Sequence, residues 1–257
     1  MNIRDEEVLR ELNLYPLWVR RATDVGRVCG SDFSPTQSGG SPQPVGLKPD
    51  PQEKSDEFSA RTSVRQIAPD WAALKQQVAE CTACKLRAGC RQTVFGVGDE
   101  QADWLFVGEG PGADEDAQGE PFVGQAGKLL DNMLLALKLK RGSNVYIANV
   151  VKCRPPANRT PEADEIATCL PYLQQQIALI KPKLIVALGK TAATALLGRE
   201  AALAALRGMV HDYHGTPLVV TYHPAYLLRS PAEKAKAWQD LCLARATLIH
   251  SSSGKTE

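Results

Sequence analysis

The sequence has no long apolar run and no marked excess of either charge. None of its apolar stretches approaches the roughly 20 residues that a membrane-spanning helix needs. Its first seven residues, Met1 to Glu7, are mostly polar or charged where a signal peptide would need an apolar run. The 30 basic residues nearly cancel the 29 acidic ones, so the net charge of +1 gives no global indication of nucleic-acid binding. We therefore expect a soluble, cytoplasmic protein without a membrane partner, whose basic surfaces are local.

Composition divides the chain into four parts. We expect a short helical segment at 1–21, a disordered linker at 22–68, a folded domain at 69–250 and a disordered tail at 251–257. The linker contains the stretch from Ser31 to Pro51, in which twelve of 21 residues are Ser, Pro or Gly. Such a composition buries too little apolar surface to offset the entropy of ordering the chain.

Apolar runs of strand length alternate with amphipathic segments of helix length in the predicted domain. After a helix at Trp71–Val78, we expect strands at Trp104–Val107, Asn144–Val151, Leu184–Leu188 and Leu218–Tyr222, and helices near 125–139, 161–180, 190–206 and 231–250. This alternation predicts a parallel sheet with helices on both faces. Ligands of such sheets bind beyond the carboxyl ends of the strands, so the loops that follow strands are the informative ones.

Seven cysteines in a reducing compartment favour metal binding over disulfides. Cys81 and Cys84 form a C-x-x-C pair, which can direct two sulfurs at one metal centre, and Cys153 and Cys169 follow much later in the chain. Structural zinc usually brings a second close pair, which is missing here. Four thiolates from separate segments suit an iron–sulfur cubane. Spacing alone leaves the fourth ligand open, because Cys90 is a candidate as well.

A glycine-rich loop follows the first predicted strand. It includes Glu109, Gly110 and Pro111 and continues to Phe122. A dinucleotide site is the usual interpretation of such a loop, but the acidic side chains would repel a pyrophosphate and the proline lacks an amide to bind it. A neutral, flat ligand fits better, with Phe122 either stacking on it or packing in the core.

The last predicted strand ends just before His223, which precedes a proline-fixed turn and is therefore a candidate for chemistry. For His211 and His214, in a short polar connection, we expect a structural role. Between Lys138 and Arg159 the chain has six basic residues and no acidic one. Such a stretch is able to follow a phosphate backbone.

Together these motifs closely resemble those of family 4 uracil-DNA glycosylases, and the resemblance runs from about 75 to 249. It is carried by the segments Gly108–Gly112, Gly119–Gly124, Asn149–Pro156, Asn158–Pro161 and His223–Tyr226, in this order, and by the cysteine set. Five separated motifs in order are far more specific than any one of them.

The resemblance implies a three-layer α/β/α fold with a central four-stranded parallel sheet. It also implies that Cys81, Cys84, Cys153 and Cys169 hold a structural 4Fe-4S cluster. The implied activity is base excision repair: the enzyme flips uracil out of single- or double-stranded DNA and hydrolyses its N-glycosidic bond.

The resemblance also implies a role for each pocket residue. We expect Phe122 to stack on uracil, the backbone of Glu109, Gly110 and Pro111 to line one edge of the base, and Asn149 to read its pairing edge. His223 is the candidate donor to the base, and either Glu109 or Asn158 positions water on the sugar side.

The same resemblance gives the residues after His223 a role in DNA contact. Tyr226, Leu227 and Leu228 are expected to form an apolar wedge that fills the gap in the base stack, with Arg229 on a phosphate. We expect a monomer, and a protein partner is conceivable for the N-terminal segment. The alternatives are a catalytically inactive iron–sulfur protein that only binds DNA, and an electron-transfer protein.

Overall fold

A computed structural model of the chain describes residues 70–253, and every structural statement below concerns them. The predicted N-terminal helix at 1–21 and linker at 22–68 lie outside the described residues. At the other end, the last helix continues to Ser253, three residues beyond the predicted end of the domain, and 254–257 lie outside.

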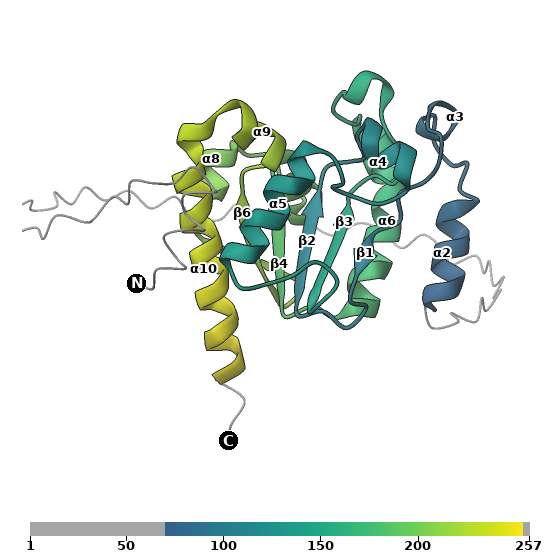
Figure 1. The fold of residues 1–257 in the computed structure, drawn as a ribbon. Coiled ribbons are helices and arrows are strands. Elements are labelled where there is room, and N and C mark those ends of the chain that lie inside the picture. The colour runs from purple at the N-terminus through teal and green to yellow at the C-terminus, as the bar shows by residue number, and fades with distance from the viewer. Residues whose placement is uncertain (1–69, 254–257) are drawn as a thin grey trace, which may run out of the picture. The chain divides into compact units, whose positions relative to one another are not determined.

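A six-stranded sheet with the order β1-β3-β2-β4-β6-β5 forms the centre of the described domain (Figure 1). The inner strands, which run parallel, are β3 (Val145–Asn149), β2 (Trp104–Gly108), β4 (Leu184–Leu188) and β6 (Thr216–Thr221). They confirm the four predicted strands. The antiparallel edge strands β1 (Val97–Gly98) and β5 (Val210–Tyr213) were not predicted. The polar connection that contains His211 is thus half of a hairpin, because β5 pairs with β6.

The helices follow the predicted alternation. They are α2 (Trp71–Ala79), α3 (Leu86–Gly89), α4 (Ala113–Gln118), α5 (Gln125–Ala136), α6 (Ala163–Ile180), α7 (Lys190–Leu197), α8 (Leu203–Leu206), α9 (Pro224–Arg229) and α10 (Lys234–Ser253). The predicted helix at 190–206 is two helices, because Gly198 ends α7 with a φ of 63°. Within the described residues, no helix has both the length and the apolar character needed to cross a membrane.

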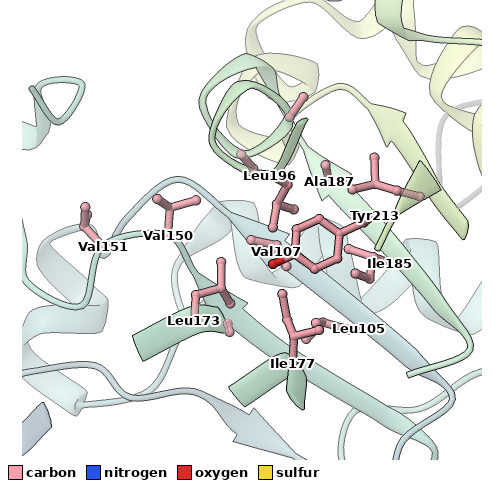
Figure 2. Close-up of a cluster of buried hydrophobic side chains, with 14 of the residues drawn as sticks. Leu105, Val107, Val150, Val151, Leu173, Ile177, Ile185, Ala187, Leu196 and Tyr213 are labelled. Carbon is pink, nitrogen blue, oxygen red and sulfur yellow. The ribbon is translucent and has the colours of Figure 1, made fainter. Parts of the chain in front are cut away.

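Successive residues of the inner strands point to opposite faces of the sheet, and both faces are covered. Figure 2 shows one face, where Leu105 and Ile185 pack with Leu173 and Ile177 of α6 and Leu196 of α7. On the other face, the alternate strand residues, including Phe106 and Val186, pack against helices α5 and α10. A strand covered on both faces needs a continuous apolar run, as β4 has. These layers confirm the predicted three-layer α/β/α fold.

Candidate active site

A cleft of about 460 Å³ opens beyond the carboxyl ends of β2, β3 and β6. It brings together most of the residues that the sequence nominated for the pocket and for DNA contact: Glu109, Gly110, Pro111, Phe122, Asn149, Asn158, His223, Tyr226 and Arg229. The cleft forms where the loops after three neighbouring strands meet, as expected for an open parallel sheet.

Asn149 presents an unused hydrogen-bond acceptor at this cleft. It is the last residue of β3, pairs with Gly108 of β2 and is only 2% exposed. Its Oδ1 atom is buried and has no hydrogen-bond partner among the described residues. A side chain at position 108 would clash with this atom and with the ring of Phe122, so glycine is required there. A buried acceptor left unpaired costs about 1–3 kcal/mol, which a ligand donor would recover.

His223 presents a hydrogen-bond donor. Its Nδ1 atom accepts a hydrogen bond from the Ala225 amide at 3.1 Å, which caps helix α9. Burial, helped by the positive charge of Arg229, lowers the pKa of His223 to about 4, so the ring is neutral at pH 7. A neutral imidazole whose Nδ1 accepts must carry its proton on Nε2. The ring lies against Phe122, with the ring centroids 5.5 Å apart.

Glu115 organises the glycine-rich loop, a role not predicted from the sequence. Its carboxylate accepts hydrogen bonds from the amides of Gly112, Val123 and Gly124 at 2.9–3.0 Å. A glutamate three residues after a helix N-cap is the usual partner of the cap's amide, so the sequence did carry this signal. Glu115 joins the loop before α4 to the loop that carries Phe122.

Thr191, in the first turn of α7, was missed as well. Its hydroxyl donates a hydrogen bond to the carboxylate of Glu109, so α7 fixes the direction of that side chain. The two residues lie 82 positions apart, and no local pattern connects them.

Asn158 lies on a tight turn at the edge of the cleft. Ala157 and Asn158 both have positive φ, 52° and 55°. The Oδ1 atom of Asn158 accepts a hydrogen bond from Arg154 Nε at 2.7 Å. The next residue, Arg159, binds both carboxylate oxygens of the buried Glu165, at 2.7 and 2.9 Å. The turn is therefore anchored to the start of α6.

The predicted basic stretch is not one exposed face. Lys152 is 1% exposed, and Arg159 is bound to Glu165. Arg141 is paired with Asp131 and also donates to backbone carbonyls. Charge patterns along the sequence do not reveal which cations have partners inside the fold, so this expectation was wrong for the stretch as a whole.

The residues predicted as an apolar wedge lie in helix α9. Tyr226 and Leu228 are 38% and 43% exposed, but Leu227 is 1% exposed and packs in the core with α5 and α10. A helix turns about 100° per residue, so three consecutive side chains cannot face the same side. Leu227 is therefore corrected from a DNA contact to a core residue.

A second, small cavity is lined by the four predicted cluster ligands Cys81, Cys84, Cys153 and Cys169. We call it the thiol cavity. Burial raises the pKa of the Cys153 and Cys169 thiols above the ordinary value. Cys90 is buried as well and does not line the cavity, but its thiol interacts with that of Cys153. Within residues 70–250, no three His, Cys, Asp or Glu side chains are placed to hold a single metal ion.

Lys152 lies between the cleft and the thiol cavity. Its Nζ atom donates to the backbone carbonyl of Asn149 at 2.8 Å and to Gln176 Oε1 at 2.7 Å, while its backbone amide donates to Cys169 Sγ at 3.2 Å. Burial lowers the pKa of Lys152 to about 8. One buried side chain thus touches the strand that carries Asn149 and lines the thiol cavity.

Comparison with known proteins agrees with this geometry. Residues 95–242 match the family model of the Uracil DNA glycosylase superfamily. A type-4 uracil-DNA glycosylase of Pyrobaculum aerophilum is 44% identical over 184 residues, which cover 68% of this chain and 92% of the relative. The type-4 uracil-DNA glycosylase of Thermotoga maritima is 44% identical over 165 residues, 63% of this chain and 85% of the relative. A type-5 uracil-DNA glycosylase of P. aerophilum is less similar, 33% identical over 148 residues, 51% of this chain and 64% of the relative.

Proposed function

The chain belongs to the type-4 uracil-DNA glycosylases, which makes it a DNA glycosylase and a hydrolase, and from that premise we propose how its residues remove uracil from DNA. The cleft is the uracil pocket, and uracil reaches it by leaving the base stack. The observation that carries this proposal is the buried, unpartnered Oδ1 of Asn149. The N3–H group of uracil is the donor that this oxygen lacks, and the Asn149 amide NH₂ matches uracil O4.

Stacking supplies the remaining ground-state recognition. The ring of Phe122 lies in the cleft and is held against His223. A flat base that enters beside it lies along the backbone of Glu109, Gly110 and Pro111. Aromatic stacking is worth about 1–3 kcal/mol per base.

His223 acts on the leaving base. As the glycosidic bond stretches, negative charge builds on uracil O2, and a donor aimed there stabilises the transition state more than the ground state. The neutral His223 ring has its Nε2–H available for this, because Nδ1 is occupied by the Ala225 amide. The ring therefore donates a hydrogen bond without first having to gain a proton.

Glu109 acts on the sugar side. The sugar becomes cation-like as the bond breaks, and a carboxylate stabilises that charge while orienting the attacking water. Thr191 holds the Glu109 carboxylate in place. We assign this role to Glu109 in preference to Asn158, because Asn158 is neutral and its Oδ1 already accepts from Arg154.

Tyr226, Leu228 and Arg229 form the DNA-facing surface. Tyr226 and Arg229 line the cleft, and Tyr226 and Leu228 are among the exposed large apolar side chains of the described chain. We propose that Tyr226, which lines the cleft, fills the space that the flipped base leaves, that Leu228 contacts the DNA from another side of the helix, and that Arg229 binds a phosphate.

The thiol cavity suits a 4Fe-4S cluster held by Cys81, Cys84, Cys153 and Cys169. The fit is one of chemistry: four soft sulfur donors from the segments before α3, after β3 and in α6 converge on one buried cavity. When bound, the cluster would crosslink these segments and so support the fold. The buried Lys152 ammonium beside the cavity is a suitable counter-charge for four thiolates.

One assay tests the activity. The purified protein is incubated with a uracil-containing oligonucleotide, abasic sites are cleaved with alkali, and a shortened product is expected. A matched oligonucleotide with cytosine in place of uracil should stay intact. If the uracil strand is bound but never shortened while the iron content is full, the alternative of an inactive DNA-binding protein would replace this proposal.

A further inference from the structure

We infer that Arg141, which does not line the cleft, is a positioning residue for uracil stacking: its guanidinium holds the main chain at Phe122 in the conformation that presents the ring to the base. This inference rests on the proposed stacking role of Phe122. It gives Arg141 a task other than binding phosphate.

The planar guanidinium of Arg141 contacts three acceptor groups. Its Nη1 atom donates to the Pro121 carbonyl at 2.8 Å and its Nη2 atom to the Phe122 carbonyl at 2.8 Å. Its Nε atom donates to the Asp131 carboxylate at 3.0 Å, which ties the guanidinium to helix α5. A fixed fork of five N–H donors can serve three acceptors at once, whereas a lysine offers a single point charge.

The conformation that Arg141 holds is an unfavourable one. Phe122 has a φ of 56°, in the left-handed region where glycine is the usual residue. Glycine here would remove the ring that the cleft uses. A strained backbone persists only where its surroundings over-determine it.

Contacts on both sides of Phe122 meet this requirement. Arg141 holds the carbonyls of Pro121 and Phe122, while Glu115 holds the amides of Val123 and Gly124. The Phe122 carbonyl also lies against helix α5, where Gly127 is needed because any side chain would clash with it. Loosening the carbonyl side releases Phe122 toward ordinary φ values and turns its ring away from His223.

A double-mutant cycle tests this link. The variants are Arg141→Met, Phe122→Ala and the two combined, with kcat and KM measured on a single-stranded uracil oligonucleotide. We expect Arg141→Met to lower kcat/KM roughly 10- to 100-fold, mainly through KM, because small misplacements of binding groups have effects of this size. In the Phe122→Ala background, Arg141→Met should change kcat/KM less than about twofold, since the ring it positions is gone.

Two further variants control the cycle. Arg141→Lys keeps the charge but not the fork and should restore only part of the loss. Arg199→Met removes a guanidinium that contacts His211 outside the cleft, and it should leave kcat/KM unchanged. If Arg141→Met does not fold, Arg141→Lys takes its place in the cycle.

The outcomes separate the two proposals. If Phe122→Ala keeps full activity, the stacking role fails, and the inference about Arg141 fails with it. If Phe122→Ala is impaired but the Arg141 variants are not, or if the two losses simply multiply, the stacking role stands and the positioning role of Arg141 is overturned.

Discussion

The proposed uracil pocket and the thiol cavity use the same stretch of chain in opposite ways. Only three residues separate Asn149, which faces the cleft, from Cys153, which lines the cavity. The pocket depends on polar atoms that are buried but left unpaired, such as Asn149 Oδ1. The cavity depends on bringing together thiols from distant segments. In the functions that we propose, the cleft binds a substrate that is released after each reaction, and the cavity holds a cluster permanently.

This difference indicates which substitutions should affect the reaction alone and which should affect the fold. Substitutions in the pocket should change the reaction and leave the fold intact, because the pocket is built on loops beyond the sheet. Substitutions in the cavity should change the fold and, through it, everything else. Lys152 contacts both the Asn149 carbonyl and the cavity.

The largest effect is expected at the cavity. Native protein should be brown, with broad absorption near the visible–ultraviolet boundary, and Cys153→Ser should bleach it and lower its stability by several kcal/mol or prevent folding. Cys242→Ser, which removes an exposed thiol outside the cavity, is the matched control and should keep the colour. Iron analysis and thermal melts measure both. One zinc ion and no iron in the native protein would show that the cluster assignment is wrong.

His223→Ala tests the expectation that a substitution in the cleft changes the reaction and leaves the fold intact. We expect the single-turnover rate to fall roughly 10²–10³-fold, as for loss of one oxyanion-type donor, with little change in DNA affinity or in visible absorption. Enzyme in excess over a uracil oligonucleotide isolates the chemical step. An unchanged rate would return His223 to a purely structural role as the cap of α9.

The four inner strands could be predicted from the sequence because each has a local apolar pattern. The apolar run Leu184–Leu188 has the bounds of β4 in the structure. The edge strand β1 has only two residues and leaves no pattern to detect. Strand β5 has exposed and partly buried residues and one buried residue, Tyr213, without the apolar run of a buried strand, and pairing with β6 makes it a strand.

The sequence motifs predicted the residues that line the cleft, but not the residues that hold them in place. Asn149, Phe122 and His223 were nominated correctly as residues of one cleft. Thr191 and Arg141 contact residues far away in sequence, which no single segment reveals. The prediction of Leu227 as a DNA contact was wrong although its sequence neighbours Tyr226 and Leu228 are exposed. Only the helix geometry turns Leu227 inward.

Asn149 should decide between uracil and cytosine, which differ mainly in the polarity of the pairing edge. Asn149→Ala removes two hydrogen bonds and should lower uracil excision roughly 10- to 100-fold. Asn149→Asp should also lower it and should narrow the preference for uracil over cytosine, because a carboxylate has no donor for uracil O4. Rates on both substrates measure the two effects. Full rate and unaltered discrimination in Asn149→Ala would mean that another residue reads the base.

The smallest expected effect is a dependence of folding stability on pH, which comes from His223 in the cleft. The pKa of His223 is lowered to about 4 in the folded protein, mainly by burial, whereas an unfolded histidine titrates near 6.5. Between these values the unfolded chain binds a proton that the folded protein does not, so this part of the stability is fully present above about pH 6.5 and is lost as the pH falls toward 4. From pH 7 to 5.5 the loss is about 1 kcal/mol, or about 2–4 °C in Tm. The Tm of His223→Ala should therefore fall less than the Tm of the native protein between pH 7 and 5.5. The difference in Tm between the two proteins at pH 8 gives the effect of the lost contacts alone and serves as the baseline. If the Tm of both proteins falls equally over this pH range, the His223 ring is solvated, and the basis for a neutral donor in the pocket is removed.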